Sequence, residues 1–271
     1  MKTTHITTTQ RWLPALSALW LLSLVFGPAL IGFLGLNLNP HGHTHLYAHG
    51  HPFVDARTLW GIPNAMDVLS NLPMALAGFW GWRLLADGRH LPTATARAAR
   101  VFFIGLVLTG IGSTIYHWAP DASSLVLDRL GMAVSFAGAL SLALAERAGQ
   151  VAARAALGWV LAAALLSAVL PAANDNTLPW AVVQFGGLTL IVRLALLPAA
   201  EGAVGVRLGG VIGLYALAKA LELGDEAMFQ ATAGQLSGHS LKHLAAALAA
   251  WPVIVAVTNR GLRQNAAARV A

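Results

Sequence analysis

The sequence predicts an all-α, polytopic membrane protein, a seven-transmembrane-helix bundle with one extra N-terminal transmembrane helix. Hydrophobic residues make up 57% of the 271 residues and charged residues only 10%, whereas soluble proteins carry about 25% charged residues. Too few polar side chains are therefore present to cover a water-facing surface. Eight apolar stretches have the length of a spanning helix, about 20 residues: 12–36, 64–86, 97–118, 124–146, 151–171, 178–199, 205–223 and 239–258.

The apolar stretches divide the chain into four parts. Residues 1–40 contain the N-terminal transmembrane helix, 41–63 a histidine-rich external loop, 64–259 the seven-helix core and 260–271 a basic cytoplasmic tail. Lys2 and Arg11 precede the first stretch, as basic residues precede the apolar part of a signal peptide. Its apolar run exceeds the roughly 7–15 residues typical of such a peptide and no A-x-A site ends it, so we expect a retained helix.

The basic residues predict which way the helices run. With the N-terminus in the cytoplasm, 13 of the 17 lysines and arginines fall in cytoplasmic segments, as the positive-inside rule requires. Both termini are therefore expected in the cytoplasm. The same distribution explains the net charge of +6 without a nucleic-acid partner, since no basic run with interleaved aromatic residues is present. The chain has no cysteine, which excludes disulfides, thiolate metal ligands and cysteine nucleophiles.

Ionisable residues inside a membrane are costly and therefore mark candidate functional sites. The first cluster lies in "GIGSTIYHWAPDASSLVLDRLGM", residues 110–132. Ser113 and His117 are four residues apart, so they share one face of the third predicted helix, and His117 lies near its external end. Asp128 follows in the first part of the next helix, again on the external side. Taken singly, Ser113 can be a small residue that aids helix packing and Asp128 an interfacial partner of Arg129, and these interpretations remain open.

The second cluster is "SGHSLKHLAAALAA", residues 237–250, at the external start of the last predicted helix. His239 and His243 are also four residues apart, the spacing by which one helix supplies two metal ligands. With His117 as a third ligand, a metal site would keep an open position for water, as catalytic zinc sites do. All three histidines come out on one side of the membrane, although the orientation is assigned from basic residues alone. Lys242 is expected to extend its ammonium group outward.

A third, diffuse group of polar residues opens the second predicted helix and ends the seventh. Its members are Asn64, Asp67, Ser70, Asn71, Glu222, Asp225 and Glu226. Residues of this group and the tyrosine beside His117 are expected to support the histidines or to cap helices rather than to react. The supporting set is Asp67, Ser70, Asn71, Tyr116, Glu222 and Asp225.

At these positions the sequence resembles the alkaline ceramidase family, part of a superfamily of seven-helix membrane hydrolases that includes the adiponectin/progestin-type receptors. The family pattern is S-x-x-x-H, an aspartate eleven residues later, and a C-terminal H-x-x-x-H, matched here by Ser113, His117, Asp128, His239 and His243. The "SN" at Ser70–Asn71 also matches. "GIPNAMDVLSNLP" and "GHSLKHLAAALAA" resemble the bacterial branch, which implies a bacterial inner membrane. The resemblance covers about residues 55–258.

The resemblance implies a zinc-dependent hydrolase that cleaves the amide bond of a ceramide-like membrane lipid on the external, periplasmic side. The three histidines would hold Zn²⁺, Ser113 would stabilise the oxyanion, and Asp128 would act as general base on the attacking water. The animal enzymes also carry an acidic calcium-binding segment, with a glutamate seven residues before the conserved asparagine. This sequence has Asn64 at that position, which puts a calcium requirement in doubt. No protein partner can be inferred.

Several alternatives use the same residues. A receptor or scaffold of the same superfamily would keep the metal without turnover, although the short loops offer little signalling surface. A haem protein would need histidine pairs at two depths, a metal transporter would need ligands across the membrane, and a rhomboid-type serine protease would need G-x-S-G where this chain has "GIGST". The loop "HGHTHLYAHGH", residues 41–51, holds five of the ten histidines. We expect a solvated linker or a weak metal-capturing segment there, because no helix fixes its ligands.

Overall fold

The computed structural model describes residues 3–35, 53–86 and 91–270, and the histidine-rich stretch 41–51 lies outside them. Within these ranges the chain forms helices and no β-strand, which confirms the all-α prediction, and one antiparallel bridge joins Leu59 to Ile62. The helices are α1 (Thr3–Phe33), α3 (Ala65–Leu69), α4 (Leu72–Leu84), α5 (Thr93–Trp118), α6 (Ala122–Arg147), α7 (Gln150–Asn174), α8 (Leu178–Ala181), the π-helical turn η1 (Val182–Gly186), α9 (Gly187–Ala195), α10 (Leu208–Leu223), α11 (Asp225–Ala231), α12 (Gly238–Leu248) and α13 (Trp251–Val270).

Six helical stretches in the described part of the chain are long and apolar enough to cross a membrane, which supports an integral membrane protein. They are Trp12–Phe33, Thr93–Trp118, Ala122–Arg147, Gln150–Asn174, Leu178–Ala195 and Gly238–Leu262. The predicted stretches 64–86 and 205–223 are also helical, but α4 has 13 residues and α10 has 16, so the count of eight spans stays a prediction. Helix α13 continues to Val270, through most of the predicted tail.

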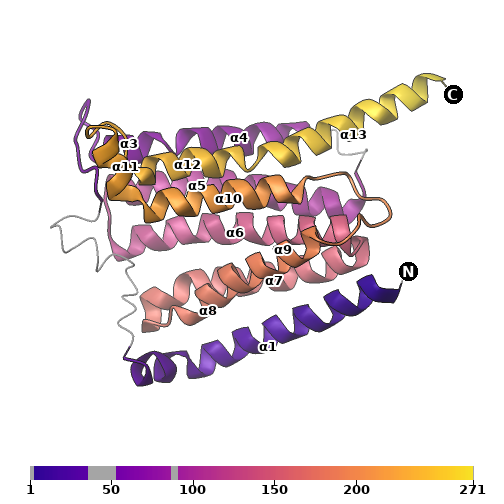
Figure 1. Cartoon of the computed structure of the whole chain (residues 1–271), viewed down its shortest axis with the longest axis horizontal. Helices are drawn as coiled ribbons and strands as arrows, with labels where there is room; N and C mark the ends of the chain where they lie inside the picture. Colours follow the sequence, from indigo (N-terminus) through magenta and orange to yellow (C-terminus); the bar gives the residue numbers. More distant parts are fainter. Residues whose placement is uncertain (1–2, 36–52, 87–90, 271) are drawn as a thin grey trace.

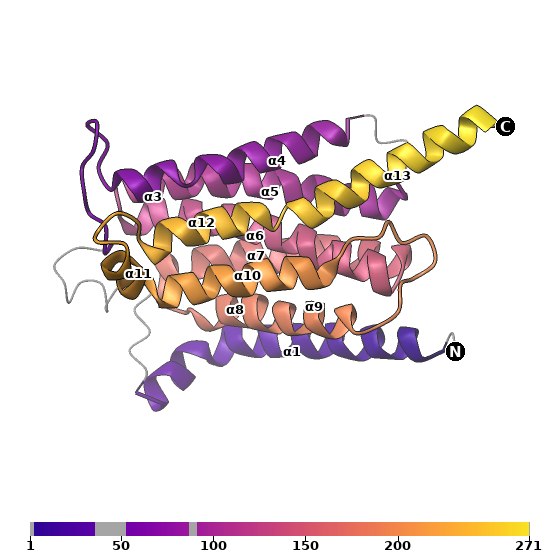
Figure 2. The ribbon, with the colours of Figure 1, turned by 45° about the horizontal axis from the view of Figure 1, so that its top comes forward.

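The helices pack as a closed ring with two helices outside it. Around the ring, contacts join α4 to α5, α5 to α6, α6 to α9, α9 to α10, α10 to α12, and α12 back to α4. Helix α7 packs on α6, and α1 lies at the edge of the bundle against α7, α8 and η1 (Figure 1 and Figure 2). Helix α1 begins and α13 ends at one end of the bundle, whereas α3 and α11 lie at the other end (Figure 1).

Glycines at a seven-residue spacing bring α5 and α6 into close contact. Gly105 and Gly112 lie on α5, and Gly131 and Gly138 lie on α6. A Cβ atom at any of the four would collide with the main chain of the facing helix. Small residues are the usual means of close helix packing in membranes, where lipid tails give apolar side chains no preference for one another. The repeat therefore sets the register in which residues of α5 meet residues of α6.

Helix α1 is joined to the bundle by hydrogen bonds as well as apolar contacts. The indole Nε1 of Trp20 donates to Ser167 Oγ of α7 over 2.8 Å. The side-chain amide of Asn176, which is fully buried, donates to the carbonyl of Ser23 over 3.0 Å. Polar groups at membrane depth must be satisfied within the protein, so these pairs hold α1 at a defined place. The predicted N-terminal helix is thus an integrated part of the fold.

A buried carboxylate holds the loop between α9 and α10. Glu146, near the end of α6, is 0% exposed and accepts main-chain hydrogen bonds from Val204, Gly205 and Val206 over 2.8, 2.9 and 3.0 Å. An acidic residue at a helix C-terminus is disfavoured by the helix dipole. Here three N–H donors from the loop offset that cost and anchor the connection to the ring.

We predict that Glu146→Ala lowers the free energy of unfolding by several kcal/mol. Each main-chain N–H left buried without an acceptor costs about 1–3 kcal/mol, and the substitution removes the acceptor of three. Thermal unfolding of the detergent-solubilised protein measures the effect. Glu201→Ala, an exposed acidic residue in the same loop, is the matched control and should change stability by less than about 0.5 kcal/mol. Equal melting temperatures for the two variants would contradict the anchoring role.

Candidate metal centre

Three histidines from two helices meet at the end of the bundle that holds α3 and α11. His117 lies in the last turn of α5, and His239 and His243 lie one turn apart on α12. One ligand nitrogen from each lies within 4.8 Å of the others, and the ring centroids are 4.7, 5.2 and 5.0 Å apart. The predicted pairing of His239 and His243 on one helix, with His117 as a third member, is thus present in the structure. Among the described residues, these three histidines form the one group of histidine or acidic side chains that lie close enough together to hold a metal ion.

The donor set fits a single tetrahedral ion. The Nε2 atoms of His117 and His239 are 3.2 Å apart. Two nitrogens bound to one zinc ion at about 2.0–2.1 Å and a tetrahedral angle would lie roughly 3.3 Å apart. Neutral imidazoles are common ligands of zinc and other transition metals. Three histidines leave a fourth position for water or substrate, which is the arrangement of catalytic sites.

Ser70 fixes the ring of His243. The Oγ atom of Ser70 lies 2.8 Å from His243 Nδ1 and 3.0 Å from the main-chain carbonyl of Asp67. When Ser70 donates its single hydroxyl proton to the Asp67 carbonyl, His243 Nδ1–H donates to Ser70. This tautomer leaves Nε2 of His243 unprotonated and able to bind a metal. Such a hydrogen bond on the far nitrogen is usual for metal-ligating histidines.

A buried aspartate ties α3 to the start of α12. The Oδ1 atom of Asp67, a residue that is 0% exposed, accepts hydrogen bonds from Ser240 Oγ over 2.6 Å and from Ser237 Oγ over 3.3 Å. Ser237 also caps α12 by accepting from the main-chain N–H of Ser240. Asn71 donates to the carbonyl of Asp67 over 2.9 Å. Asp67 therefore holds α12 against α3, and Asn71 supports Asp67. Ser237 and Ser240 were not foreseen from the sequence.

The main chain at the start of α12 is held from α11. Asp225 accepts a hydrogen bond from the N–H of His239 over 2.7 Å. Burial raises the pKa of Asp225, and the hydrogen bond from His239 opposes that shift. Gly238 permits the close approach, since a Cβ atom there would meet the carbonyl of Leu221. Asp225 thus supports the position of His239, as expected, through its main chain.

Ser113 and Asp128 lie side by side across the α5–α6 interface. Ser113 is within hydrogen-bonding reach of the Asp128 carboxylate. Ser113 and Asp128 face each other because α5 and α6 pack closely at Gly112, where a Cβ atom would collide with the main chain of Leu127. Asp121 starts α6 through a reciprocal capping box with Ser124, and the donors on Ser124 hold the pKa of Asp121 below its usual value. Ser113, whose hydroxyl would bind an oxyanion, thus has the Asp128 carboxylate as its partner in the structure.

Phe53 covers the histidines from the segment before α3. Its side chain is 1% exposed, and its ring centroid lies 4.5 Å from that of His117 and 5.7 Å from that of His239. Tyr116 makes an edge contact with Phe53 at 5.7 Å and so belongs to the same aromatic cover. Phe53 was not foreseen, and the only sequence signal for it is an aromatic residue two positions after the histidine-rich stretch 41–51.

Asp55 and Asn64, on either side of the turn before α3, make hydrogen bonds within the protein. Both oxygens of Asp55 accept hydrogen bonds from the guanidinium of Arg57, over 2.7 and 2.6 Å, and Arg57 also donates to the carbonyl of Gln235. The amide of Asn64 donates to the carbonyl of His117, at the end of α5, over 2.8 Å. Calcium needs six to eight oxygen ligands, and these groups are already engaged elsewhere. That calcium is not required stays a prediction from the sequence.

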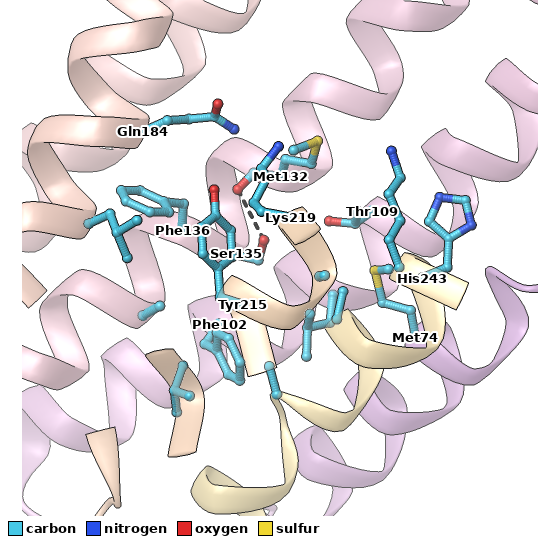
Figure 3. A pocket seen from close by; sticks show the side chains of 18 of the residues that line it. Met74, Phe102, Thr109, Met132, Ser135, Phe136, Gln184, Tyr215, Lys219 and His243 are labelled. Atoms are coloured by element: carbon cyan, nitrogen blue, oxygen red, sulfur yellow. Dashed lines mark hydrogen bonds between the residues drawn. The ribbon is translucent and has the colours of Figure 1, made fainter. Parts of the chain in front are cut away.

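A cavity of about 200 Å³ opens beside the histidines. We call it the central cavity. Its polar lining includes Ser113, Asp128, Lys219, Glu222, Lys242 and His243, together with Thr109, Ser135, Gln184 and Tyr215, and its apolar lining includes Phe102, Leu106, Met132, Phe136, Ile191 and Val211. Figure 3 shows His243 and Lys219 entering it from different helices, with Phe102 and Phe136 further along. Glu222 was expected to support the histidines, but it pairs instead with Lys219 and Lys242. The expectation that Lys242 extends outward was wrong.

We predict that Ser70→Ala weakens metal binding about 10–100-fold, the usual cost of removing the hydrogen-bond partner of a ligating histidine. Without Ser70 the Nδ1–H tautomer of His243 loses the partner that selects it. Competition with a chromophoric chelator measures the dissociation constant. Ser141→Ala is the control, since the Ser141 hydroxyl is buried and has no hydrogen-bond partner among the described residues. A dissociation constant unchanged by Ser70→Ala would refute the positioning role.

Comparison with known proteins adds no family assignment. No family model matches the chain, and a search of the curated proteins gives no significant match. The resemblance to the alkaline ceramidases thus rests on the residues themselves, and function has to be argued from the geometry of the site.

Proposed function

We propose that this protein is a zinc-dependent membrane amidohydrolase that cleaves the amide bond of a ceramide-like lipid and releases a fatty acid. The observation that carries the proposal is that one cavity is lined by a histidine of the three-ligand cluster, by a carboxylate and a hydroxyl, and by a long apolar wall. The resemblance of the same residues to the alkaline ceramidases points to the same reaction.

The chemistry of amide hydrolysis matches these groups. A zinc ion held by the three histidines would supply a Lewis acid that polarises the amide carbonyl and acidifies a water molecule. Asp128 lines the cavity beside them and can take the proton of the attacking water, then return it to the leaving amine. Ser113 can turn its hydroxyl from Asp128 to the oxygen on which negative charge develops.

The surroundings favour a lipid over a soluble amide. The central cavity lies within a ring of helices whose outer surface carries exposed leucine, isoleucine and tryptophan side chains, as expected for contact with lipid. Its wall beyond the histidines is formed mostly by aromatic and aliphatic side chains, with Ser135 and Gln184 among them. Such a wall can receive an acyl chain, while the amide group stays near the polar end.

The proposal is tested by assaying fatty-acid release from a panel of lipid amides. Purified protein in lipid nanodiscs is incubated with N-acyl sphingoid bases, N-acyl ethanolamines and N-acyl amino acids, and the products are measured by mass spectrometry. We expect release of the fatty acid, loss of release after chelation, and recovery with zinc. Recovery with calcium alone would argue against the assignment of the metal.

The outcome also separates the enzyme from a receptor-like protein. Stoichiometric zinc without release from any lipid amide, in native membranes as well as nanodiscs, would favour a receptor or scaffold that keeps the metal. Release that persists after the metal has been removed would exclude the metal-dependent mechanism.

A further inference from the structure

Three charged side chains form a cluster in the wall of the central cavity. Lys219 and Glu222 lie on α10, and Lys242 lies on α12. The ammonium groups of both lysines lie 2.6 Å from Glu222, one on each carboxylate oxygen. All three residues line the same cavity as His243 and Asp128. The cluster therefore faces the space in which a substrate of the metal centre would lie.

The cluster carries more positive than negative charge. Two ammonium groups share one carboxylate, and each ammonium has three donors of which Glu222 takes one. Asp128, Asp225 and Asp67 also interact electrostatically with Lys242 and add negative charge, and Arg129 beside Asp128 adds one positive charge. These groups cancel the excess, and a divalent metal ion held by the histidines would restore it. Lys219 and Glu222 are 39% and 35% exposed, so their charge is partly solvated, and with the metal bound the site favours a ligand with a negative group.

The polar end of the cavity is divided between two kinds of groups. His243, Ser113 and Asp128 come from α12, α5 and α6, whereas the two lysines come from α10 and α12 and meet at Glu222. A neutral ceramide offers hydroxyl groups, which an ammonium pair does not distinguish from water. A carboxylate or phosphate makes charge-assisted hydrogen bonds, which are about twice as strong as neutral ones.

We propose that Lys219 and Lys242, bridged by Glu222, form a subsite for an anionic headgroup, so that the substrate is an acidic lipid amide such as an N-acyl amino acid. The part of this inference that makes the substrate an amide rests on the proposed function. The acyl chain lies along the apolar wall, the amide faces the histidines, and the carboxylate or phosphate of the headgroup accepts hydrogen bonds from the two lysines. Glu222 holds both ammonium groups in place and limits the excess charge to one.

Binding of a matched ligand pair tests the subsite. N-palmitoylglycine and its methyl ester differ in one negative charge and share the acyl chain and the amide. Full-length, zinc-loaded protein in phosphatidylcholine nanodiscs is mixed with each ligand, and the change in tryptophan fluorescence, to which Trp180 in the cavity wall contributes, is recorded by stopped flow before turnover. We expect the acid to bind about tenfold more tightly than the ester, the worth of roughly one charge-assisted hydrogen bond.

Variants of opposite charge make the test sharper. Lys219→Gln and Lys242→Gln should bring the ratio of the two affinities close to one, and Lys219→Arg should restore it. Glu222→Gln should raise the ratio above the wild-type value, because it removes the negative charge of the cluster. If the two lysines and Glu222 had only a structural role, every variant would bind the acid and the ester more weakly by the same factor, and the ratio would not change. Metal content and melting temperature are measured for each variant, so that loss of the metal centre is recognised.

Three results would overturn the inference. The first is binding of the ester as tightly as the acid, and the second is weaker binding of the acid by Glu222→Gln. The third is a dependence on the lysines that is seen with free palmitate alone, which would mark a site for the product. A lysine-dependent preference for the acid without hydrolysis of any amide would support the subsite and reject the proposed function. Hydrolysis of a lipid amide without that preference would support the proposed function and reject the subsite.

Discussion

Replacing His117 by alanine is expected to abolish tight metal binding by the purified protein. The substitution leaves two ligands on α12 and removes the one from α5, so the remaining donors come from a single helix. We expect a loss of affinity greater than the roughly 10–100-fold that follows from removing a hydrogen-bond partner of a ligand. Metal content after dialysis against a weak chelator, determined by elemental mass spectrometry, gives the result. His239→Ala and His243→Ala should behave in the same way.

The control is a variant in which all five histidines of residues 41–51 are replaced by alanine. It removes more imidazoles than the three single variants together and should still retain one tightly bound metal ion per chain. The opposite pattern, with metal lost from the loop variant and kept by His117→Ala, would place the centre in the loop and reject the site described above.

Asp128→Asn is expected to lower the rate of amide hydrolysis about 10²–10⁴-fold while the metal stays bound, which is the usual contribution of a general base. Asparagine keeps the size of the side chain and can still accept a hydrogen bond from Ser113, but it cannot accept the proton of a water molecule. Initial rates of fatty-acid release, divided by bound metal, give the effect.

Asp121→Asn is the matched control for this substitution. Asp121 caps the same helix, seven residues earlier, and asparagine caps helices as well as aspartate does. The control should therefore retain the wild-type rate. Hydrolysis by Asp128→Asn at the rate of the control would show that another group takes the proton. Loss of metal from Asp128→Asn would instead assign the residue to the metal centre.

The helical fold and the pairing of histidines could be predicted because both depend on neighbours in sequence. Apolar stretches of spanning length form helices wherever water is excluded, since the main chain must then satisfy its own hydrogen bonds. Residues four apart on a helix share a face, so the pair on α12 was expected before any tertiary contact was known. The convergence of His117 with this pair followed from placing all three at one membrane depth.

The supporting contacts could not be predicted in the same way. Ser70 meets His243 across 173 residues of chain, and Phe53 meets His117 from a segment with no helical pattern. Lys242 shows the limit most clearly. Its sequence neighbours suggest a lysine that extends toward water, but the carboxylate of Glu222 on the facing helix offers a closer partner inside the cavity.

The sequence by itself determined that this protein is a helical membrane protein with three histidines capable of meeting at one depth. Only the tertiary structure decided which nitrogen of His243 contacts Ser70, which residues surround the histidines, and that two lysines share the cavity with His243. The physical reason is that helical spacing places side chains on a face, whereas the facing partner depends on register between helices. That register is set by close contacts such as those at Gly112 and Gly238, whose partners lie elsewhere in the chain.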